Sequence, residues 1–188
     1  MSRWEPNARG RLQQAALELY RERGFDQTTV AEIAQRAGLT ERTFFRYFAD
    51  KREVLFWGEG ALHELFVHAV TGAPDSAAPL DAIAAGLEAA ADLFRERRDQ
   101  ARQRQAVIAA NKELQEREVM KLASLAAGMA DALRRRGVGE PAASLTAEAG
   151  VAVFKVAFGR WIDADDNEDL LHHIRESLVE LKGLTAGQ

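Results

Sequence analysis

The segment TTVAEIAQRAGLTERTFFRYFADKREVL, residues 28–55, decides how the N-terminal part of this chain folds. Its stretch from Thr40 to Lys51 places three phenylalanines and a tyrosine beside two arginines and a lysine. Aromatic side chains at this density belong in a core, whereas arginines belong at a surface. We therefore expect a short helix here, with one buried face and one exposed polar face.

A glycine turn divides the segment into two predicted helices. The first begins at Thr29, because Thr29 and Glu32 have the spacing of a capping box, and it ends at Gly38. Thr40 can cap the second helix, expected over residues 40–48, so the connection is tight. The second helix and the small core that it closes are expected to bury Leu39, Phe44 and Phe48 together with Leu12, Leu19, Ile33 and Val54.

The outer side of the second helix carries Glu41, Arg42, Thr43, Arg46 and Tyr47. Two helices joined by a tight turn, the second one polar outward, are typical of a helix-turn-helix, whose second helix enters the DNA major groove. Arg42 and Thr43 lie in its first turn, where arginine can pair with guanine and a threonine methyl can contact thymine. The same pattern would also suit the surface of a three-helix bundle that binds no DNA.

Residues 28–55 resemble the N-terminal signature of the TetR family of transcriptional repressors. In that signature a threonine pair leads to Ile-Ala and then to Ala-Gly before the turn. An aromatic pair, a phenylalanine and a Lys-x-x-Leu follow it. The resemblance covers about residues 7–57, and the matching positions are Thr28, Thr29, Ile33, Ala34, Ala37, Gly38, Leu39, Thr43, Phe45, Phe48, Lys51, Val54 and Leu55.

The resemblance implies DNA-binding roles for individual polar residues of this segment. Glu41, Arg42 and Thr43 would face bases, and Arg46 could face either a base or a phosphate. Double-stranded DNA is therefore the expected partner. The residues implied to hold phosphates are Thr29, Thr40, Tyr47 and Lys51.

One position departs from the family pattern. The family often has a tyrosine where this chain has Phe45, which lacks a hydroxyl for a phosphate. A charge-assisted hydrogen bond of about 1–3 kcal/mol is then missing unless Tyr47 replaces it. Phe45 could instead pack on a sugar or on a thymine methyl.

The chain as a whole is expected to be all-α, with about nine helices, because Ala, Leu, Glu and Arg dominate and Pro occurs only four times. We expect a helix-turn-helix DNA-binding domain over residues 1–50 and a helical effector-binding and dimerisation domain over 51–188. Besides the two helices above, helices are predicted over residues 7–23, from 50 past 65, and over 80–98, 101–110, 112–135, 142–163 and 167–183.

Family members are homodimers whose last two long helices pair with those of a partner, so the resemblance implies a homodimer here. Both C-terminal helices carry apolar residues at helical spacing. Alternatively, each apolar stripe faces only the core of its own subunit. The candidate interface residues are Leu145, Ala149, Val153, Val156, Leu170, Leu171, Ile174 and Leu178.

The middle helices of the family enclose a pocket for a small-molecule effector, which the resemblance therefore implies here. The arginines of RERRDQARQR, residues 95–104, would favour an anionic ligand such as an acyl-coenzyme A if they lined its mouth, although such mixed charges are typical of a solvated surface. The helix break near residues 109–114 is similar to that of a family subgroup that includes regulators of mycofactocin-type redox clusters. Candidate pocket residues are Phe66, Phe94, Arg102, Asn111, Phe154, Phe158 and Trp161.

The net charge of −4 is distributed unevenly along the chain. Residues 1–52 hold ten Lys and Arg against seven Asp and Glu, a balance of +3 that leaves −7 for the remainder. A basic head on an acidic body permits a polyanion such as DNA at one end. Since the chain has no run of eighteen apolar residues and no signal peptide, we expect a cytoplasmic protein without a membrane partner.

An enzyme is disfavoured by the available motifs. The chain has no cysteine, no glycine-rich phosphate loop and no nucleophile elbow. The stretch HELFVH places His63 and His68 about 140° apart on a helix, so they cannot share a metal ion. No cofactor or metal is expected. The alternative to a DNA-binding regulator is a helical adaptor or an enzyme without DNA binding.

Overall fold

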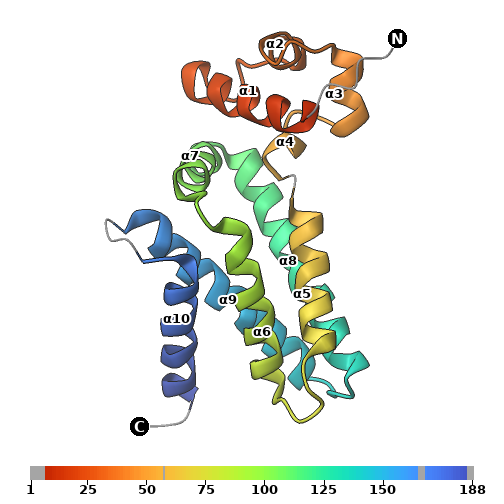
Figure 1. Cartoon of the computed structure of the whole chain (residues 1–188), viewed down its shortest axis with the longest axis vertical. Helices are drawn as coiled ribbons and strands as arrows, with labels where there is room; N and C mark the ends of the chain where they lie inside the picture. The colour runs from red at the N-terminus through yellow and green to blue at the C-terminus, as the bar shows by residue number, and fades with distance from the viewer. Residues whose placement is uncertain (1–6, 57, 165–167, 186–188) are drawn as a thin grey trace. The chain divides into compact units, whose positions relative to one another are not determined.

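The computed structural model describes residues 7–56, 58–164 and 168–185, and every regular element in these ranges is a helix (Figure 1). The all-α prediction is thus confirmed. The helix expected from residue 50 past 65 is divided in two near residue 58, and residue 167, where the last helix was expected to begin, lies outside the described ranges. The elements are α1 (Ala8–Arg23), α2 (Val30–Arg36), α3 (Glu41–Tyr47), α4 (Glu53–Phe56), α5 (Glu59–Gly72), α6 (Pro79–Ala91), the 3-10 helix η1 (Asp92–Phe94), α7 (Arg98–Ala109), α8 (Lys112–Arg135), α9 (Ala142–Asp163) and α10 (Leu170–Thr185).

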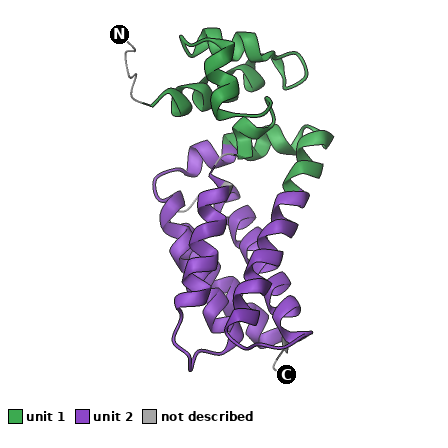
Figure 2. Ribbon diagram, turned by 90° about the vertical axis from the view of Figure 1, so that its right-hand side faces the viewer, with its two compact units in different colours: residues 1–57, 103–118 green, residues 58–102, 119–188 purple. Residues whose placement is uncertain are grey.

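The chain forms two compact units, which Figure 2 shows in different colours. The first unit, called the head below, combines residues 1–57 with residues 103–118. The second unit, called the body, combines residues 58–102 and 119–188. The head therefore includes a segment, 103–118, that lies outside the predicted domain of residues 1–50.

The short helices of the head begin at side-chain caps that the sequence predicts. Thr29 Oγ1 accepts a hydrogen bond from the Glu32 amide at 3.2 Å, and the Glu32 carboxylate accepts from the Thr29 amide at 2.9 Å. Thr40 Oγ1 likewise accepts from the Thr43 amide at 3.2 Å, which caps α3. Such caps satisfy backbone donors that a helix end leaves without partners, so they locate the start of each helix.

The head core contains the residues predicted for it. Phe44 is fully buried, Phe48 is buried beside it with ring centroids 5.4 Å apart, and Leu39 packs against the core while partly exposed. Burying a phenylalanine or leucine stabilises a fold by about 1.5–3 kcal/mol. The same core takes in Val107, Ile108 and Leu114 from the segment 103–118, together with Leu12, Leu19, Ile33 and Val54.

The body core is built from α5, α6, α9 and α10 and from the part of α8 that begins at residue 119. Helix α9 alone, among the helices of the described ranges, is long and apolar enough to cross a membrane by length and composition. Such a helix is also typical of a protein core, and nine residues of α9 are buried here. Gly150 permits a close approach at its centre, because a Cβ atom at this position would lie 2.4 Å from Ile83 Cγ2.

Gly150→Ala should destabilise the body, although glycine to alanine within a helix normally stabilises a protein by about 0.5–1 kcal/mol. The new methyl group overlaps the buried Ile83 side chain, and such overpacking costs about 1–3 kcal/mol. Chemical denaturation measures the free energy of unfolding. Gly183→Ala is the control, because nothing lies within 4 Å of its new Cβ. A gain of stability in both variants would contradict this packing.

Candidate nucleic-acid interface

Helix α3 presents one exposed side. Glu41, Arg42, Phe45 and Arg46 are exposed, and at 100° per residue they cover an arc of about 140°. Phe45 is 55% exposed, while its neighbour Phe44 is 0% exposed and holds the Phe45 ring edge-on at 5.4 Å. The helix therefore offers two cations, a carboxylate and an aromatic ring to a partner.

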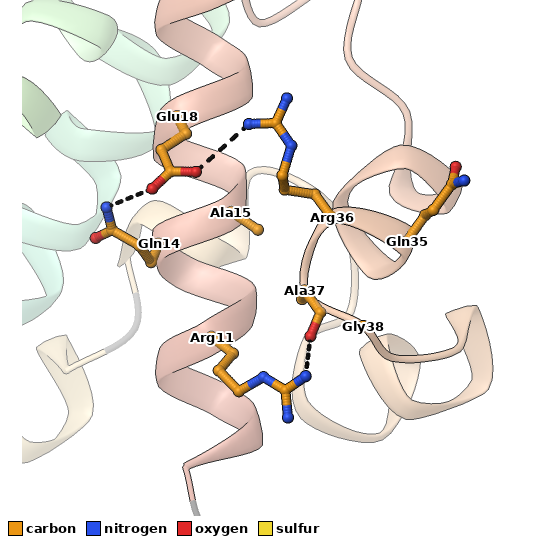
Figure 3. Close-up of a pocket in the computed structure, with 8 residues that line it drawn as sticks. All are labelled: Arg11, Gln14, Ala15, Glu18, Gln35, Arg36, Ala37 and Gly38. Carbon is orange, nitrogen blue, oxygen red and sulfur yellow. Dashed lines mark hydrogen bonds and ion pairs between the residues drawn. The ribbon is translucent and has the colours of Figure 1, made fainter.

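The turn between α2 and α3 depends on Gly38. Its φ of +66° lies in the left-handed region, and a Cβ atom here would lie 2.7 Å from Arg11 Nη2. Arg11 also donates a hydrogen bond to the Ala37 carbonyl. A surface hollow between α1 and α2 is lined by these residues and by Glu18, whose carboxylate contacts Arg36 at 3.4 Å (Figure 3). The polar groups of the hollow bind one another and thereby fasten the turn to α1.

Two arginines on α3 differ from most others in the head. Among the described residues, Arg42 and Arg46 form no ion pair with a carboxylate. In contrast, Arg23 contacts Glu32 at 2.7 Å, Arg36 contacts Glu22 at 2.8 Å, and Arg52 contacts Asp50 at 2.6 Å and Glu113 at 2.8 Å. The unneutralised positive charge of α3 is thus directed outward, where an anion can approach it.

Tyr47 lies at the end of α3, and two guanidinium groups contact its ring. The Arg46 Cζ atom is 4.9 Å from the centre of the Tyr47 ring, and Arg46 Nη2 donates to Tyr47 Oη at 3.3 Å. The Arg9 Cζ atom, from α1, lies 5.3 Å from the centre of the same ring. Sequence reasoning missed Arg9, because the resemblance gives no role to α1 and no pattern connects two residues so far apart in the chain.

The hydroxyl groups of two predicted phosphate-binding residues are used inside the head. Thr29 Oγ1 lies 3.0 Å from Glu32 Oε2 in addition to its capping bond. Thr40 Oγ1 lies 3.0 Å from Thr43 Oγ1, so these two hydroxyls share a hydrogen bond. In this arrangement Thr29, Thr40 and Thr43 organise the starts of α2 and α3.

Lys51 is engaged still more completely. Its Nζ donates to the carbonyl oxygens of Phe25 at 2.8 Å and Thr28 at 3.0 Å, with that of Asp26 at 3.4 Å. The ammonium also lies 4.3 Å from the centre of the Phe25 ring. The Lys51 carbonyl accepts a hydrogen bond from Tyr20 Oη at 2.6 Å. Lys51 thus ties the loop between α1 and α2 to the segment that precedes α4.

The groups around Lys51 reinforce this tie. Burial raises the pKa of the Tyr20 hydroxyl, and the nearby Asp50 carboxylate raises it further, so Tyr20 keeps its proton. A hydrogen bond from Arg52 lowers the pKa of Asp50, which stays ionised and accepts from the Glu53 amide at 3.2 Å. Near neutral pH, Tyr20 is therefore protonated and Asp50 is ionised, and these are the states that the hydrogen bonds require.

The aromatic candidates for an effector pocket lie together in the body. Phe94 has its ring centre 5.4 Å from that of Phe158 and 6.1 Å from those of Phe154 and Trp161. The Phe66 ring meets Phe154 edge-on at 6.1 Å. These five rings form one aromatic cluster in the body.

The two polar pocket candidates are placed differently. Arg102 donates through Nε to the Ile162 carbonyl at 2.5 Å and through Nη2 to the Ala164 carbonyl at 3.2 Å, at the C-terminal end of α9. Asn111 belongs to the head, where its Nδ2 donates to the Val107 carbonyl at 2.6 Å. Arg102 thus caps α9, and the side chain of Asn111 bonds to the backbone of its own unit.

The candidate dimer residues fall into two groups. Leu145 is 66% exposed and Val156 is 55% exposed, and Ala149 and Leu171 are partly exposed. The other group is buried within its own subunit: Val153, Leu170, Ile174 and Leu178. For this second group the structure matches the alternative in which the stripe faces its own core.

Two family models match the chain. The model described as bacterial regulatory proteins, tetR family, matches residues 12–56. The model described as the MftR C-terminal domain matches residues 77–185, which is more than half of the chain. The two matches leave only residues 1–11, 57–76 and 186–188 uncovered.

Individual relatives resemble the chain over shorter stretches or in fold alone. The HTH-type transcriptional regulator TcmR of Streptomyces glaucescens is 38% identical over 81 residues, which cover 43% of this chain and 36% of TcmR. The chain thus spans about a third of the length of that relative. A TetR-family regulator of Syntrophomonas wolfei has a TM-score of 0.68 at 15% identity, covering 96% of both chains. FadR of Bacillus subtilis, solved with stearoyl-CoA, has a TM-score of 0.64 at 20% identity, covering 92% of this chain and 96% of FadR.

Lys51→Met should destabilise the head, because methionine keeps much of the chain volume but cannot donate to the loop carbonyls. Hydrogen bonds from a charged group contribute about 1.5–3 kcal/mol, so the free energy of unfolding should fall by an amount in this range. Lys112→Met is the control, since the Lys112 side chain is 89% exposed, and it should change stability by less than about 0.5 kcal/mol. Equal stability of the two variants would show that Lys51 does not hold the loop.

Proposed function

This chain belongs to the TetR family of bacterial regulatory proteins and has a C-terminal domain of the MftR type, and from that premise we propose that it is a homodimeric repressor released from DNA by a small molecule. It is a DNA-binding transcriptional regulator and belongs to a family of non-enzymes. The observation that carries the proposal is the outward face of α3, where an exposed phenylalanine lies beside two arginines that pair with none of the described carboxylates. We further propose a cytoplasmic location.

In this proposal α3 reads the major groove with its first turn. Arg42 is exposed there and can form a bidentate pair with guanine, while Glu41 can accept from cytosine. Phe45, which has no hydroxyl, packs against a thymine methyl or a sugar. Arg46 and Tyr47 bind phosphates. Thr29, Thr40 and Lys51 support this surface from inside the head, since their polar atoms bond to other groups of the head.

The proposed dimer interface uses the exposed sides of α9 and α10. On α9 the exposed or half-buried residues Leu145, Ala149, Ala152 and Val156 recur at spacings of four, three and four. On α10, which packs against α9, Val179 is 71% exposed. A two-fold axis covers such a surface with the same surface of a second copy. The proposed interface thus contains the exposed residues of the predicted apolar stripes and omits the buried ones.

The proposed effector site is the aromatic cluster of the body. Its rings offer dispersion and apolar surface, and the guanidinium of Arg102 binds carbonyl groups at the end of α9. The relative FadR was solved with stearoyl-CoA. We propose an apolar effector for this chain, which enters between the rings of Phe94, Phe158 and Trp161. Such a ligand shifts the protein away from its DNA-binding state only by its differential affinity for the two states.

Binding to duplexes from around its own gene, with random duplex as competitor, tests the regulator proposal. We expect competitor-resistant binding to a palindromic segment, and Arg42→Ala should lose about 1–3 kcal/mol of discrimination at one position of each half-site. Val119→Ala, at an exposed position of α8, is the control and should bind like the wild type. The absence of duplex binding at low salt would contradict the proposal and favour an adaptor.

Val156→Glu should convert the dimer to a monomer, because each subunit would then place a carboxylate in the apolar interface. Sedimentation velocity measures the change of mass. Val119→Glu is the matched control, since Val119 is 64% exposed on a different helix, and it should remain dimeric. Ile174→Glu cannot serve as a test, because Ile174 is 0% exposed and the charge would unfold the body. An unchanged mass for Val156→Glu would exclude this face of α9.

A further inference from the structure

We propose that Phe94 is a resident plug of the effector site, which an apolar group of the ligand displaces in order to bind. The plug rests on the proposed function, because it closes the effector site named there. It lies on a strap, residues 92–97, which runs from the end of α6 to the start of α7. The ligand class follows from the plug: an uncharged alkyl or aromatic group about as wide as a phenyl ring.

Helix α9 presents three rings in a row to the plug. Phe154, Phe158 and Trp161 recur at spacings of four and three, which place them on one side of the helix. Neighbouring rings are in contact, since the ring centre of Phe158 lies 5.7 Å from those of both Phe154 and Trp161. The three rings therefore form one continuous apolar surface, called the ring row below.

Phe94 covers the ring row from a different segment of the body. Its ring centre lies 5.4 Å from that of Phe158 and 6.1 Å from those of Phe154 and Trp161. It meets Phe158 and Trp161 edge-on, which is a favourable arrangement for aromatic pairs. A single side chain thus takes the place that an apolar ligand needs in order to contact all three rings.

The strap is attached to the body core through this one side chain. Phe94 packs against the core, whereas the other five residues of the strap are exposed. The amides of Arg95 and Arg97 donate to the carbonyls of Asp92 and Phe94, at 3.3 Å and 3.0 Å, so these bonds close turns within the strap. The ring can therefore leave the ring row together with the strap, without the withdrawal of a second core residue.

Both ends of the strap are fixed within the body. Ala91, the last residue of α6, is buried in the body core, and so is Ala101 in the first turn of α7. Arg98 Nε donates to the Trp161 carbonyl at 2.6 Å, which fastens the start of α7 to α9. Movement is thus confined to the strap, while α6 and the first turn of α7 keep their places.

The strap is strained in the plugged state. Glu96 has a φ of +61°, in the left-handed region, where a residue with a side chain is destabilised. Such positions persist where other contacts over-determine them, and they cluster at ligand clamps and switch regions. Docking of the Phe94 ring supplies these contacts here, and release of the ring relieves the strain. The plugged and open states are therefore closer in free energy than the ring contacts alone would make them.

The plug selects ligands by their chemistry. The ring row offers dispersion and apolar surface, so a group that replaces Phe94 has to recover the contacts that the phenyl ring gives up. A carboxylate in this place would lose its hydration and gain no hydrogen-bond donor from the phenylalanine rings. The apparent affinity of a ligand is its intrinsic affinity reduced by the fraction of molecules in the open state. Phe94 thereby keeps weakly binding molecules out of the site.

Quenching of Trp161 fluorescence by ω-bromodecanol measures binding at the ring row. Trp4 and Trp57, the other tryptophans of the sequence, are replaced by phenylalanine in the parent protein, so the signal comes from Trp161. Phe94→Ala should raise the affinity for the probe by about tenfold to a thousandfold, since an open state populated at about 0.1–10% becomes the ground state. Leu93→Ala is the matched control in the same strap, because Leu93 is 37% exposed, and its affinity should equal that of the parent.

The outcomes separate the plug from the proposed effector site. If the probe quenches Trp161 in the parent and binds Phe94→Ala with equal or lower affinity, the plug is wrong and the effector site stands. If the probe quenches Trp161 in neither protein, both fail. If Phe94→Ala does not fold, as judged by its thermal melting, Phe94→Leu replaces it. Leucine covers less of the ring row, so affinity should still rise, by a smaller factor, and an unchanged affinity would overturn the plug.

Hydrogen exchange distinguishes a displaced plug from a void that the substitution creates. Removal of a packed ring leaves an apolar space that can itself bind small molecules, so the unsubstituted strap is measured with and without saturating probe. The Arg97 amide donates to the Phe94 carbonyl, and displacement of Phe94 opens this turn, so exchange in the strap should become faster on binding. Slower or unchanged exchange in the strap, while Trp161 is quenched, would contradict displacement and overturn the plug.

Discussion

An isolated helix of seven residues is unstable in water. The reading surface of this protein lies on such a helix, α3, so it depends on the packing of one side chain, Phe44. Phe44 is fully buried in the head core, and Thr40 caps the start of the helix, so α3 exists because its inner face is packed and its first amides are satisfied. Everything on the outer face follows from this anchoring. The buried inner face of α3 sets the orientation of the helix, so its outward-facing residues are free to contact a rigid duplex.

The sequence predicts those parts of the head that depend on neighbours along the chain. The capping box at Thr29, the turn at Gly38 and the inward position of Phe44 are local features, and the structure contains each of them. The hydrogen bonds of the Lys51 ammonium are not a local feature, because its carbonyl partners come from a loop more than twenty residues away. Helical spacing also places Val156 and Ile174 on apolar stripes. It does not show which of the two residues is buried in the core of its own subunit, since a core and an interface favour the same residue types.

Counting charges in the sequence gives the head only a mild positive balance, and the structure shows why that count is a poor measure of its surface. Several of its arginines form ion pairs with nearby carboxylates, as Arg36 of α2 does with Glu22 of α1, and these pairs connect neighbouring helices. Arg42 and Arg46 on the exposed side of α3 instead form no ion pair with any carboxylate of the described residues. The pattern of pairing, which no composition reveals, determines where a polyanion meets uncompensated charge.

Residues 103–118 contribute Val107, Ile108 and Leu114 to the head core, although they follow the first half of the body in the chain. Arg104 Nε adds a hydrogen bond to the Leu55 carbonyl at 2.6 Å, and Arg117 Nε binds Glu53 at 2.7 Å. No single continuous segment of the chain therefore contains the whole head. Recombination that exchanges N-terminal segments between relatives, in evolution or in the engineering of biosensors, would divide its core, unless the transplanted piece and residues 103–118 travel together or already match.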